Sequence, residues 1–179
     1  MDREAPVTVT VRLLANDDAP AYHALRLEGL RSAPSTFGSS EVEEAGLTRA
    51  QVEARLTGGL PDIATFGAFL GGQLVGTATL LCNPRVKTGH RANVVGMYVA
   101  EPARGHGVGR RLIDAIVARA RTIARIDDLT LSVTVGNTAA RRLYESAGFE
   151  AYAIEPHALK IDGQYYDMDM MILRLNKGT

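Results

Sequence analysis

The sequence predicts an α/β fold in which a mixed central sheet is flanked by helices. Two patterns lead to this prediction. Residues 63–81 and 152–173 each contain two extended runs around a short glycine-containing turn, which is typical of a β-hairpin. Between them, residues 93–135 hold a strand, an amphipathic helix and a second strand, as in two parallel strands joined by a crossover helix. A sheet that includes both patterns has antiparallel and parallel pairs.

A strand and a helix are expected at the start of the chain. The run Val7–Leu14 alternates in polarity and is rich in valine, which favours a strand. Asp17 and Asp18 can cap a helix that extends to about Arg31, and Pro34 closes this helix because proline cannot continue it. These two elements therefore precede the first hairpin.

Two short helical pieces are expected next. Ser40 with Glu43, and Thr48 with Gln51, have the spacing of a capping box, in which two side chains satisfy backbone N–H groups at a helix start. Gly58-Gly59 ends the second piece. Both helical pieces lie before the first predicted hairpin.

The remaining elements follow from turn residues and periodicity. Gly71-Gly72 and Asp162-Gly163 are the hairpin turns, and Gly96 indicates a bulge in the strand that contains it. A loop is expected at Asn83–Arg91, and Gly148 ends the last helix. The expected strands are Ile63–Leu70, Gln73–Leu81, Asn93–Val99, Leu129–Val135, Tyr152–Lys160 and Gln164–Leu173, and the expected helices are Val108–Ala124 and Thr138–Ser146.

Composition indicates a single globular domain over residues 1–179, with its core at about 7–175. The chain has 179 residues, 46% of them apolar, and neither a repeat nor a linker interrupts it. Its formal net charge is zero, which argues against nucleic acid or a membrane surface as a partner. No apolar run reaches the roughly 18 residues of a membrane span. The start, MDREAPVTVT, lacks the pattern of a secretory signal, so we expect a cytoplasmic protein.

The single cysteine, Cys82, excludes an intramolecular disulfide, which fits a reducing compartment. It lies in the apolar run Thr79–Leu81 and is interpreted as a buried structural thiol rather than a nucleophile.

The segment MYVAEPARGHGVGRRLIDAIVARA, Met97–Ala120, combines alternating glycines with the start of a long helix. Glycine lets backbone N–H groups converge on phosphate oxygens, and the positive end of the helix dipole favours an anion. Its apolar face is Leu112, Ile113, Ile116, Val117, Ala120, Ile123 and Ala124, and its arginines, with two flanking ones, are Arg104, Arg110, Arg111, Arg119, Arg121 and Arg125. Only Asp114 opposes these arginines, so the cluster at the helix start indicates a bound anion.

Three phosphate-binding designs are considered for this segment. A P-loop requires lysine and then serine or threonine after its last glycine, whereas Gly109 is followed by two arginines. A dinucleotide fingerprint requires G-x-G-x-x-G directly after a strand and an acid at the end of the next strand, and neither is present. The third possibility is the pyrophosphate of coenzyme A, and the glycine motif taken alone also fits a tight turn that binds no ligand.

A second motif, VTVGNTAARRLYESAGFE at Val133–Glu150, favours that design. Arg104-x-x-Gly107-x-Gly109 together with Asn137-x-x-Ala140-x-x-x-Tyr144 closely resembles the GCN5-related N-acetyltransferase (GNAT) family. The resemblance covers about Val7–Leu175 in element order and is specific at Val94–Phe149. It implies an acyl-CoA N-acyltransferase-like fold, with a strongly twisted sheet in which the parallel strands Asn93–Val99 and Leu129–Val135 splay apart.

The resemblance also implies acetyl-CoA as co-substrate and a set of contacts to it. Pantetheine is expected on backbone groups of Met97 and Val99 and on Asn137, and the pyrophosphate on the N–H groups from Arg104 to Arg110. The implied acetyl-CoA-binding residues are Met97, Tyr98, Val99, Arg104, Gly105, His106, Gly107, Val108, Gly109, Arg110, Asn137, Ala140 and Tyr144. Homodimers are common in this family.

Tyr144 is the candidate general acid. Transfer of an acetyl group from a thioester to an amine requires an aligned nucleophile, a polarised carbonyl and a proton for the leaving thiolate. Tyr144 lies on a helix just beyond the second splayed strand and can supply that proton. Its structural alternative is a core tyrosine, and that of Asn137 is a simple N-cap. Direct transfer requires no acetyl-enzyme, so Cys82 has no catalytic role.

The general base is not evident from the sequence. Many relatives have a glutamate in the strand before the glycine loop, whereas VVGMYV has none. Either a base elsewhere in the chain or proton loss through water is required. The candidate bases are His90, Glu155, Asp167 and Asp169, although the two aspartates alternate with apolar residues and favour a solvent-facing strand side. The histidines lack the spacing of metal ligands, so no metal is expected.

The acceptor and the exact class of function remain open. Glu41, Glu43 and Glu44 are interpreted as a solvated first helical turn rather than as a site for a cationic substrate. In the family the acceptor pocket is built from segments that correspond here to Tyr22–Phe37, Asn83–Arg91 and Glu155–Tyr166, and none of them identifies an amine. The alternatives to an N-acetyltransferase are a non-catalytic acyl-CoA-binding or sensing domain and a nucleotide-binding module.

Overall fold

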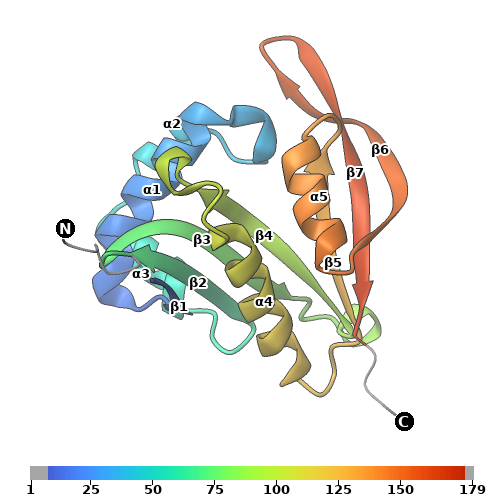
Figure 1. The fold of residues 1–179 in the computed structure, drawn as a ribbon, viewed down its shortest axis with the longest axis horizontal. Helices are drawn as coiled ribbons and strands as arrows, with labels where there is room; N and C mark the ends of the chain where they lie inside the picture. The colour runs from blue at the N-terminus through green and yellow to red at the C-terminus, as the bar shows by residue number, and fades with distance from the viewer. Residues whose placement is uncertain (1–7, 176–179) are drawn as a thin grey trace, which may run out of the picture.

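A computed structural model describes residues 8–175 of the chain (Figure 1). The helices are α1 (Ala19–Ser32), α2 (Glu41–Ala45), α3 (Arg49–Thr57), α4 (Val108–Arg121) and α5 (Thr138–Ser146). The strands are β1 (Val9–Leu13), β2 (Ile63–Leu70), β3 (Gln73–Cys82), β4 (Arg91–Val99), β5 (Asp128–Thr134), β6 (Glu150–Ile161) and β7 (Gln164–Arg174). Four single turns of 3₁₀ helix lie at Asn16–Asp18, Pro34–Thr36 (η2), Val86–Thr88 and Glu101–Ala103.

Seven strands form one mixed sheet in the order β1-β2-β3-β4-β5-β7-β6, which confirms the predicted fold class. The β4–β5 pair is parallel, and the other pairs are antiparallel. Strands β4 and β5 pair only at their first three positions, ending at Asn93 opposite Thr130. Figure 1 shows the two strands side by side at one end and diverging towards the other. This divergence is the predicted splay, and it leaves the second half of β4 without a partner on that side.

Helices cover both faces of the sheet. Helix α4 packs on β1–β4, and its buried face consists of Val108, Leu112, Ile113, Ile116, Val117 and Ala120. The amphipathic pattern predicted this face correctly. Helix α4 ends at Arg121, three residues earlier than predicted, so Ile123 packs on the core from the following turn and Ala124 is exposed. Helices α1 and α3 cover the opposite face, where Leu25, Leu30, Val52 and Leu56 are buried.

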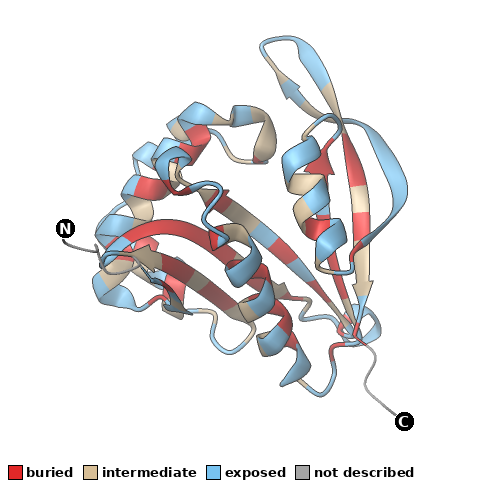
Figure 2. Cartoon of the chain, viewed as in Figure 1, coloured by how far each residue is buried: buried red, intermediate tan, exposed pale blue. Residues whose placement is uncertain are grey.

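The predicted hairpins and their turns are confirmed. Gly71 and Gly72 have φ of +58° and +81°, the backbone conformation that a tight two-residue hairpin turn requires and that glycine adopts at little cost. Asp162 and Gly163 have φ of +49° and +82° in the second hairpin. Strand β6 is one of the two edge strands of the sheet and is mostly exposed (Figure 2).

The two capping boxes are confirmed, whereas the aspartate cap is not. Ser40 and Thr48 each accept a hydrogen bond from the backbone N–H three residues on, and the side chains of Glu43 and Gln51 bond back. Asp18 precedes α1, but its side chain makes no capping bond to that helix. Its carboxylate accepts a hydrogen bond from the Ala15 N–H at 2.8 Å, at the start of the preceding 3₁₀ turn, and pairs with the charged Arg12 at 2.7 Å.

Gly96 forms the predicted bulge. After the bulge, each side chain of β4 points to the opposite face of the sheet from the one that regular alternation would give. Thr79 pairs with Val95 and Thr77 with Tyr98, so two residues of β4 oppose one residue of β3. Gly96 has φ of +62°, and its carbonyl accepts a hydrogen bond from the buried Thr77 hydroxyl at 3.3 Å. Because of the extra residue, Val94 packs with α4, whereas Tyr98 packs with α1 on the other face.

Two acidic side chains predicted to face solvent are buried instead. Glu44 is 3% exposed, and its carboxylate pairs with Arg26 at 3.0 Å and Arg55 at 3.3 Å. Asp169 is 5% exposed and accepts a hydrogen bond from Arg141. Both predictions were wrong because local alternation does not reveal a cation that approaches from another helix, and such a cation offsets much of the cost of burying a carboxylate.

Cys82 is buried at the end of β3, as predicted, and burial raises the pKa of its thiol. Within residues 8–175, no helix is long and apolar enough to cross a membrane. Part of the first predicted strand, Val7, lies outside the described residues.

Candidate active site

A cavity of about 510 Å³ lies where β4 and β5 diverge. Its walls come from the end of β4, the loop and first turn of α4, the first two turns of α5, and the region of η2. It is lined by Ala33, Thr36, Met97, Tyr98, Val99, Ala103, Arg104, Gly105, Gly107, Val108, Gly109, Arg110, Asn137, Ala139, Ala140, Leu143 and Tyr144. The splay thus brings both sequence motifs to one cavity.

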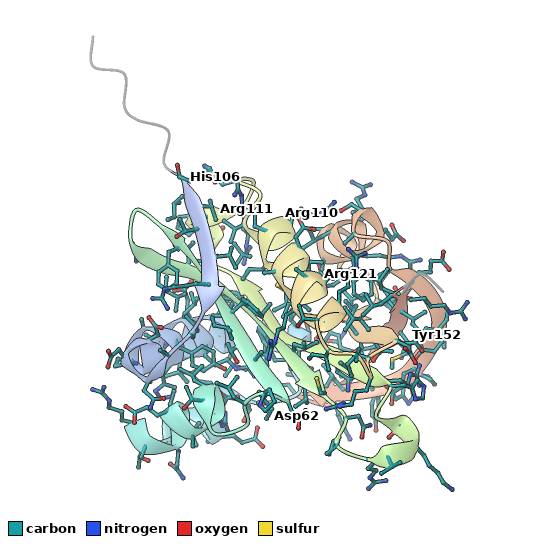
Figure 3. The ribbon with its side chains drawn as sticks, turned by 90° about the horizontal axis from the view of Figure 1, so that it is seen from below. Asp62, His106, Arg110, Arg111, Arg121 and Tyr152 are labelled. Atoms are coloured by element: carbon teal, nitrogen blue, oxygen red, sulfur yellow. The ribbon has the colours of Figure 1, made fainter. Side chains whose placement is uncertain are left out.

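Of the predicted acetyl-CoA-binding residues, only His106 does not line this cavity. It lies at the exposed tip of the loop, with Nδ1 3.0 Å from the Arg104 carbonyl oxygen (Figure 3). The predicted acetyl-CoA-binding residues did not include five others that line the cavity: Ala33 and Thr36, which lie in the predicted acceptor segment Tyr22–Phe37, and Ala103, Ala139 and Leu143. Four of these five are alanine or leucine, which carry no chemical signal, and Thr36 lies about 60 residues before the first motif in the sequence.

The start of α4 presents a ring of backbone N–H groups. Gly107 is the N-cap in the left-handed conformation with φ of +73°, and no side chain caps the helix. Gly105 also has a positive φ, +79°. The first N–H groups of an α-helix have no partner within the helix, so this end of α4 can receive an anion.

The three glycines serve two different purposes. A Cβ on Gly105 or Gly107 would meet no atom within 4 Å, so these positions need glycine for their backbone angles. A Cβ on Gly109 would lie 2.9 Å from Leu143 Cδ2. Gly109 therefore allows α4 and α5 to approach each other, which fixes the motifs relative to one another.

The arginines at this helix end make more hydrogen bonds to other residues of the protein than the sequence indicated. Arg110 donates to Asp114 at 2.9 Å and to the Ser146 carbonyl at 3.0 Å. Arg111 extends to the Val9 carbonyl on the β1 side of α4, away from the cavity (Figure 3). Of the three clustered arginines, only Arg104 and Arg110 line the cavity.

Arg104 is tied to the end of β4. Its Nε donates a hydrogen bond to the Val99 carbonyl at 3.1 Å, and its guanidinium carbon lies 6.0 Å from the centre of the Tyr98 ring. Arg104 therefore joins the glycine loop to the strand that forms one wall of the cavity. A cation in this place favours an anionic ligand beside the helix end.

Asn137 is the N-cap of α5. Its side-chain oxygen accepts a hydrogen bond from the Ala140 N–H at 3.2 Å. Because capping uses the oxygen, the amide N–H groups of Asn137 can donate into the cavity that it lines. The two interpretations of this residue are therefore compatible.

Tyr144 faces the cavity from α5. The residue is 6% exposed, packs edge-on against Phe149 with ring centroids 6.0 Å apart, and has no hydrogen-bond partner for its hydroxyl among residues 8–175. Burial raises the pKa of Tyr144 to about 12. The hydroxyl makes no hydrogen bond within the described residues, and Tyr144 lines a cavity in which a ligand can supply a partner.

The four candidate bases lie away from the cavity. His90 and Glu155 are exposed, Asp167 accepts a hydrogen bond from the His157 N–H at 2.8 Å, and Asp169 pairs with Arg141. None of the four is among the residues that line the cavity. Within residues 8–175, no group of His, Cys, Asp and Glu side chains could hold a metal ion.

The chain is similar to known proteins in both sequence and fold. The sequence profile of the acetyltransferase (GNAT) family matches residues 28–149. The chain belongs to this family. It is therefore an acyltransferase of the GNAT type, and the fold agrees: a phosphinothricin acetyltransferase from Sinorhizobium meliloti, solved in complex with AcCoA, superposes with a TM-score of 0.82 at 18% identity, over 96% of this chain and 91% of its own.

Curated relatives in the GNAT family cover nearly the whole chain. Phosphinothricin N-acetyltransferase from Alcaligenes faecalis is 29% identical over 94% of this chain and 84% of its own length. The L-methionine sulfoximine/L-methionine sulfone acetyltransferase of Pseudomonas paraeruginosa is 25% identical over 95% of this chain and 96% of its own. Both names describe transfer of an acetyl group to a small molecule.

Proposed function

We propose that this protein transfers an acetyl group from acetyl-CoA directly to a primary amine of a small molecule or peptide, with Tyr144 as general acid. The observation that carries the proposal is the cavity at the splay, which adjoins both the uncapped start of α4 and the unpartnered Tyr144 hydroxyl. The end of the cavity beside the start of α4 suits an anion, and the end beside Tyr144 suits a reacting group.

The residues at the anion end fit the pyrophosphate of acetyl-CoA. Gly105, Gly107, Val108 and Gly109 supply backbone N–H groups, and Arg104 and Arg110 supply positive charge beside them. The Asn137 amide and the unpaired edge of β4 supply hydrogen bonds for an amide-containing arm. Acetyl-CoA itself supplies the activated thioester.

The pKa of Tyr144 determines how it acts. A pKa of about 12 keeps the hydroxyl protonated at neutral pH, so it is always available as a donor. Complete transfer to a thiolate of ordinary pKa, about 8.5, would be unfavourable. Tyr144 therefore stabilises the growing negative charge by a hydrogen bond, and transfer completes when bound substrates exclude water from the cavity and so raise the basicity of the thiolate.

Calorimetry and an amine screen test the proposal. We expect acetyl-CoA to bind the protein without competition from ATP or NAD, and the complex to acetylate at least one amine in the screen. The names of the relatives make L-phosphinothricin and L-methionine sulfoximine the first acceptors to try. Absence of acetyl-CoA binding would overturn the proposal.

Strand β4 contains no carboxylate, so proton removal from the acceptor needs another group. Binding of acetyl-CoA without transfer to any amine in a wide panel would contradict transfer to an amine. A trapped acetyl-enzyme would instead contradict direct transfer.

A further inference from the structure

Tyr98 lines the same cavity as Tyr144 but has a different environment. The Gly96 bulge directs Tyr98 to the α1 face of the sheet. Its hydroxyl donates a hydrogen bond to Glu28 Oε1 at 3.0 Å and lies 3.0 Å from Ser32 Oγ. A residue of the cavity wall thus carries a phenol whose proton already points to a carboxylate.

The Tyr98 ring is held in one position. It packs on Gly29, where an added Cβ would lie 3.0 Å from ring carbons, and it faces the Phe37 ring with centroids 6.3 Å apart. The residue is 6% exposed, so the ring itself is dry. Burial raises the pKa of Tyr98, which keeps its hydroxyl protonated as the donor to Glu28.

Glu28 connects this buried phenol to solvent. The residue is exposed and takes part in no ion pair among residues 8–175. The cations nearby have other partners: Arg26 pairs with Glu44, and Arg31 pairs with Glu41. Arg104 approaches the Tyr98 ring to 6.0 Å and bonds the Val99 carbonyl. The Glu28 carboxylate is therefore free to accept a proton and to release it to water.

We propose that Tyr98 and Glu28 form a pathway by which the acceptor loses its proton, called here the proton exit. The ammonium group of the acceptor transfers its proton to the Tyr98 oxygen while the Tyr98 proton moves to Glu28. The proposal rests on the proposed acetyl transfer and supplies, from α1, the carboxylate that β4 lacks. Tyr98 is the catalytic residue that contacts the amine, and Glu28 acts through it. The site accordingly takes acceptors that arrive as cations.

The proton balance of this step is complete. The step converts R–NH₃⁺ and the Glu28 carboxylate into R–NH₂ and the Glu28 carboxylic acid, and Tyr98 regains a proton as it loses one. Glu28 then releases its proton to solvent. No oxidant, metal or further reactant takes part, and the free amine can attack the thioester.

Two conservative variants test the proton exit. Glu28→Gln keeps a hydrogen-bond acceptor but cannot take a proton, and Tyr98→Phe keeps the ring on Gly29. With the amine that the wild type acetylates best, we expect each to lower kcat/KM about 100-fold near neutral pH, with unchanged acetyl-CoA affinity by calorimetry. Glu28→Asp should restore part of the rate. Glu53→Gln, which removes an exposed carboxylate paired with Arg49 on α3, is the matched control.

The pH profile separates proton removal from a structural role. A primary amine of pKa about 10 loses its own proton in alkaline solution, so the deficit of Glu28→Gln should shrink towards wild type as the pH approaches about 9.5. A deficit that does not change with pH, or no deficit, would overturn the proton exit while leaving acetyl transfer intact. If the wild type acetylates no amine at all, the proposed function fails first and the proton exit fails with it.

Discussion

Arg141 on α5 donates a hydrogen bond of 2.7 Å to the buried carboxylate of Asp169 on β7. The same helix begins with Asn137 and carries Tyr144, so this contact ties the cavity-lining helix to the half of the sheet beyond the splay. Every residue of β5, from Asp128 to Thr134, pairs with β7. The position of the candidate general acid therefore depends on a pair that lies outside the cavity.

Removing the Asp169 carboxylate should loosen α5. We expect Asp169→Ala to lower the melting temperature by roughly 5 °C, because Arg141 loses its buried partner, and to lower acetyl transfer because α5 is less fixed. Differential scanning calorimetry and the transfer assay measure the two effects. Glu145→Gln removes the other, exposed partner of Arg141 and should change neither by much, so equal effects of the two variants would contradict this view.

Tyr144→Phe tests the general acid. We expect kcat to fall about 100-fold, with acetyl-CoA affinity unchanged, because the ring still packs on Phe149 while the proton donor is lost. Steady-state kinetics with a good acceptor measure the change. Unchanged turnover would remove Tyr144 from the mechanism and leave the fold and family assignment as they are.

The raised pKa of Tyr144 predicts a loss of stability in alkaline solution. The folded-state pKa of about 12 exceeds the ordinary value of 10.0, so stability is fully present below about pH 10 and declines as the pH rises towards 12. The reason is that the unfolded chain ionises this tyrosine first. Urea unfolding of wild type and Tyr144→Phe across this range measures it, and the variant should lose less stability. Parallel curves would mean that the hydroxyl is not buried.

Substitution of Gly107 in the glycine loop distinguishes backbone strain from steric contact of an added Cβ. Gly107→Ala should cost about 1 kcal/mol of stability and weaken acetyl-CoA binding, because alanine is strained at φ of +73° although its Cβ meets no atom. Gly107→Asn should be milder, since asparagine tolerates this conformation better. Chemical unfolding and calorimetry measure both, and an alanine variant equal to wild type would contradict the argument.

The buried Glu44 predicts a loss of stability in acid. Burial alone would raise its pKa, but hydrogen bonds and charge from Arg26, with smaller contributions from Ser39 and Arg55, leave the pKa below its ordinary value of 4.5. Its stabilisation is therefore present above about pH 4.5 and is lost as the pH falls below that value. Glu44→Ala should cost about 3 kcal/mol at neutral pH, because Arg26 is left buried without its partner. Urea unfolding at neutral and acidic pH measures this, and a variant with wild-type acid sensitivity would contradict it.

Local patterns in the sequence predicted most of the fold. The hairpin turns, the two capping boxes and the apolar face of α4 depend on residues within one or two turns of one another, so spacing alone specifies them. The strand ends differ by one or two residues from those predicted. The two family motifs located most of the residues that now line the cavity.

The sequence by itself determined where the glycine loop, Asn137 and Tyr144 lie along the chain and that the strands beside them splay. Only the tertiary structure decided that Tyr98 turns to α1, that its hydroxyl meets Glu28 from 70 residues away, and that Asp169 is buried. A one-residue bulge reverses the facing of every later side chain in a strand, and a carboxylate is buried or hydrated according to whether a distant segment brings a partner. Gly96 predicted the bulge, but which helix then meets Tyr98 and which cation meets Asp169 depend on segments far away in the sequence.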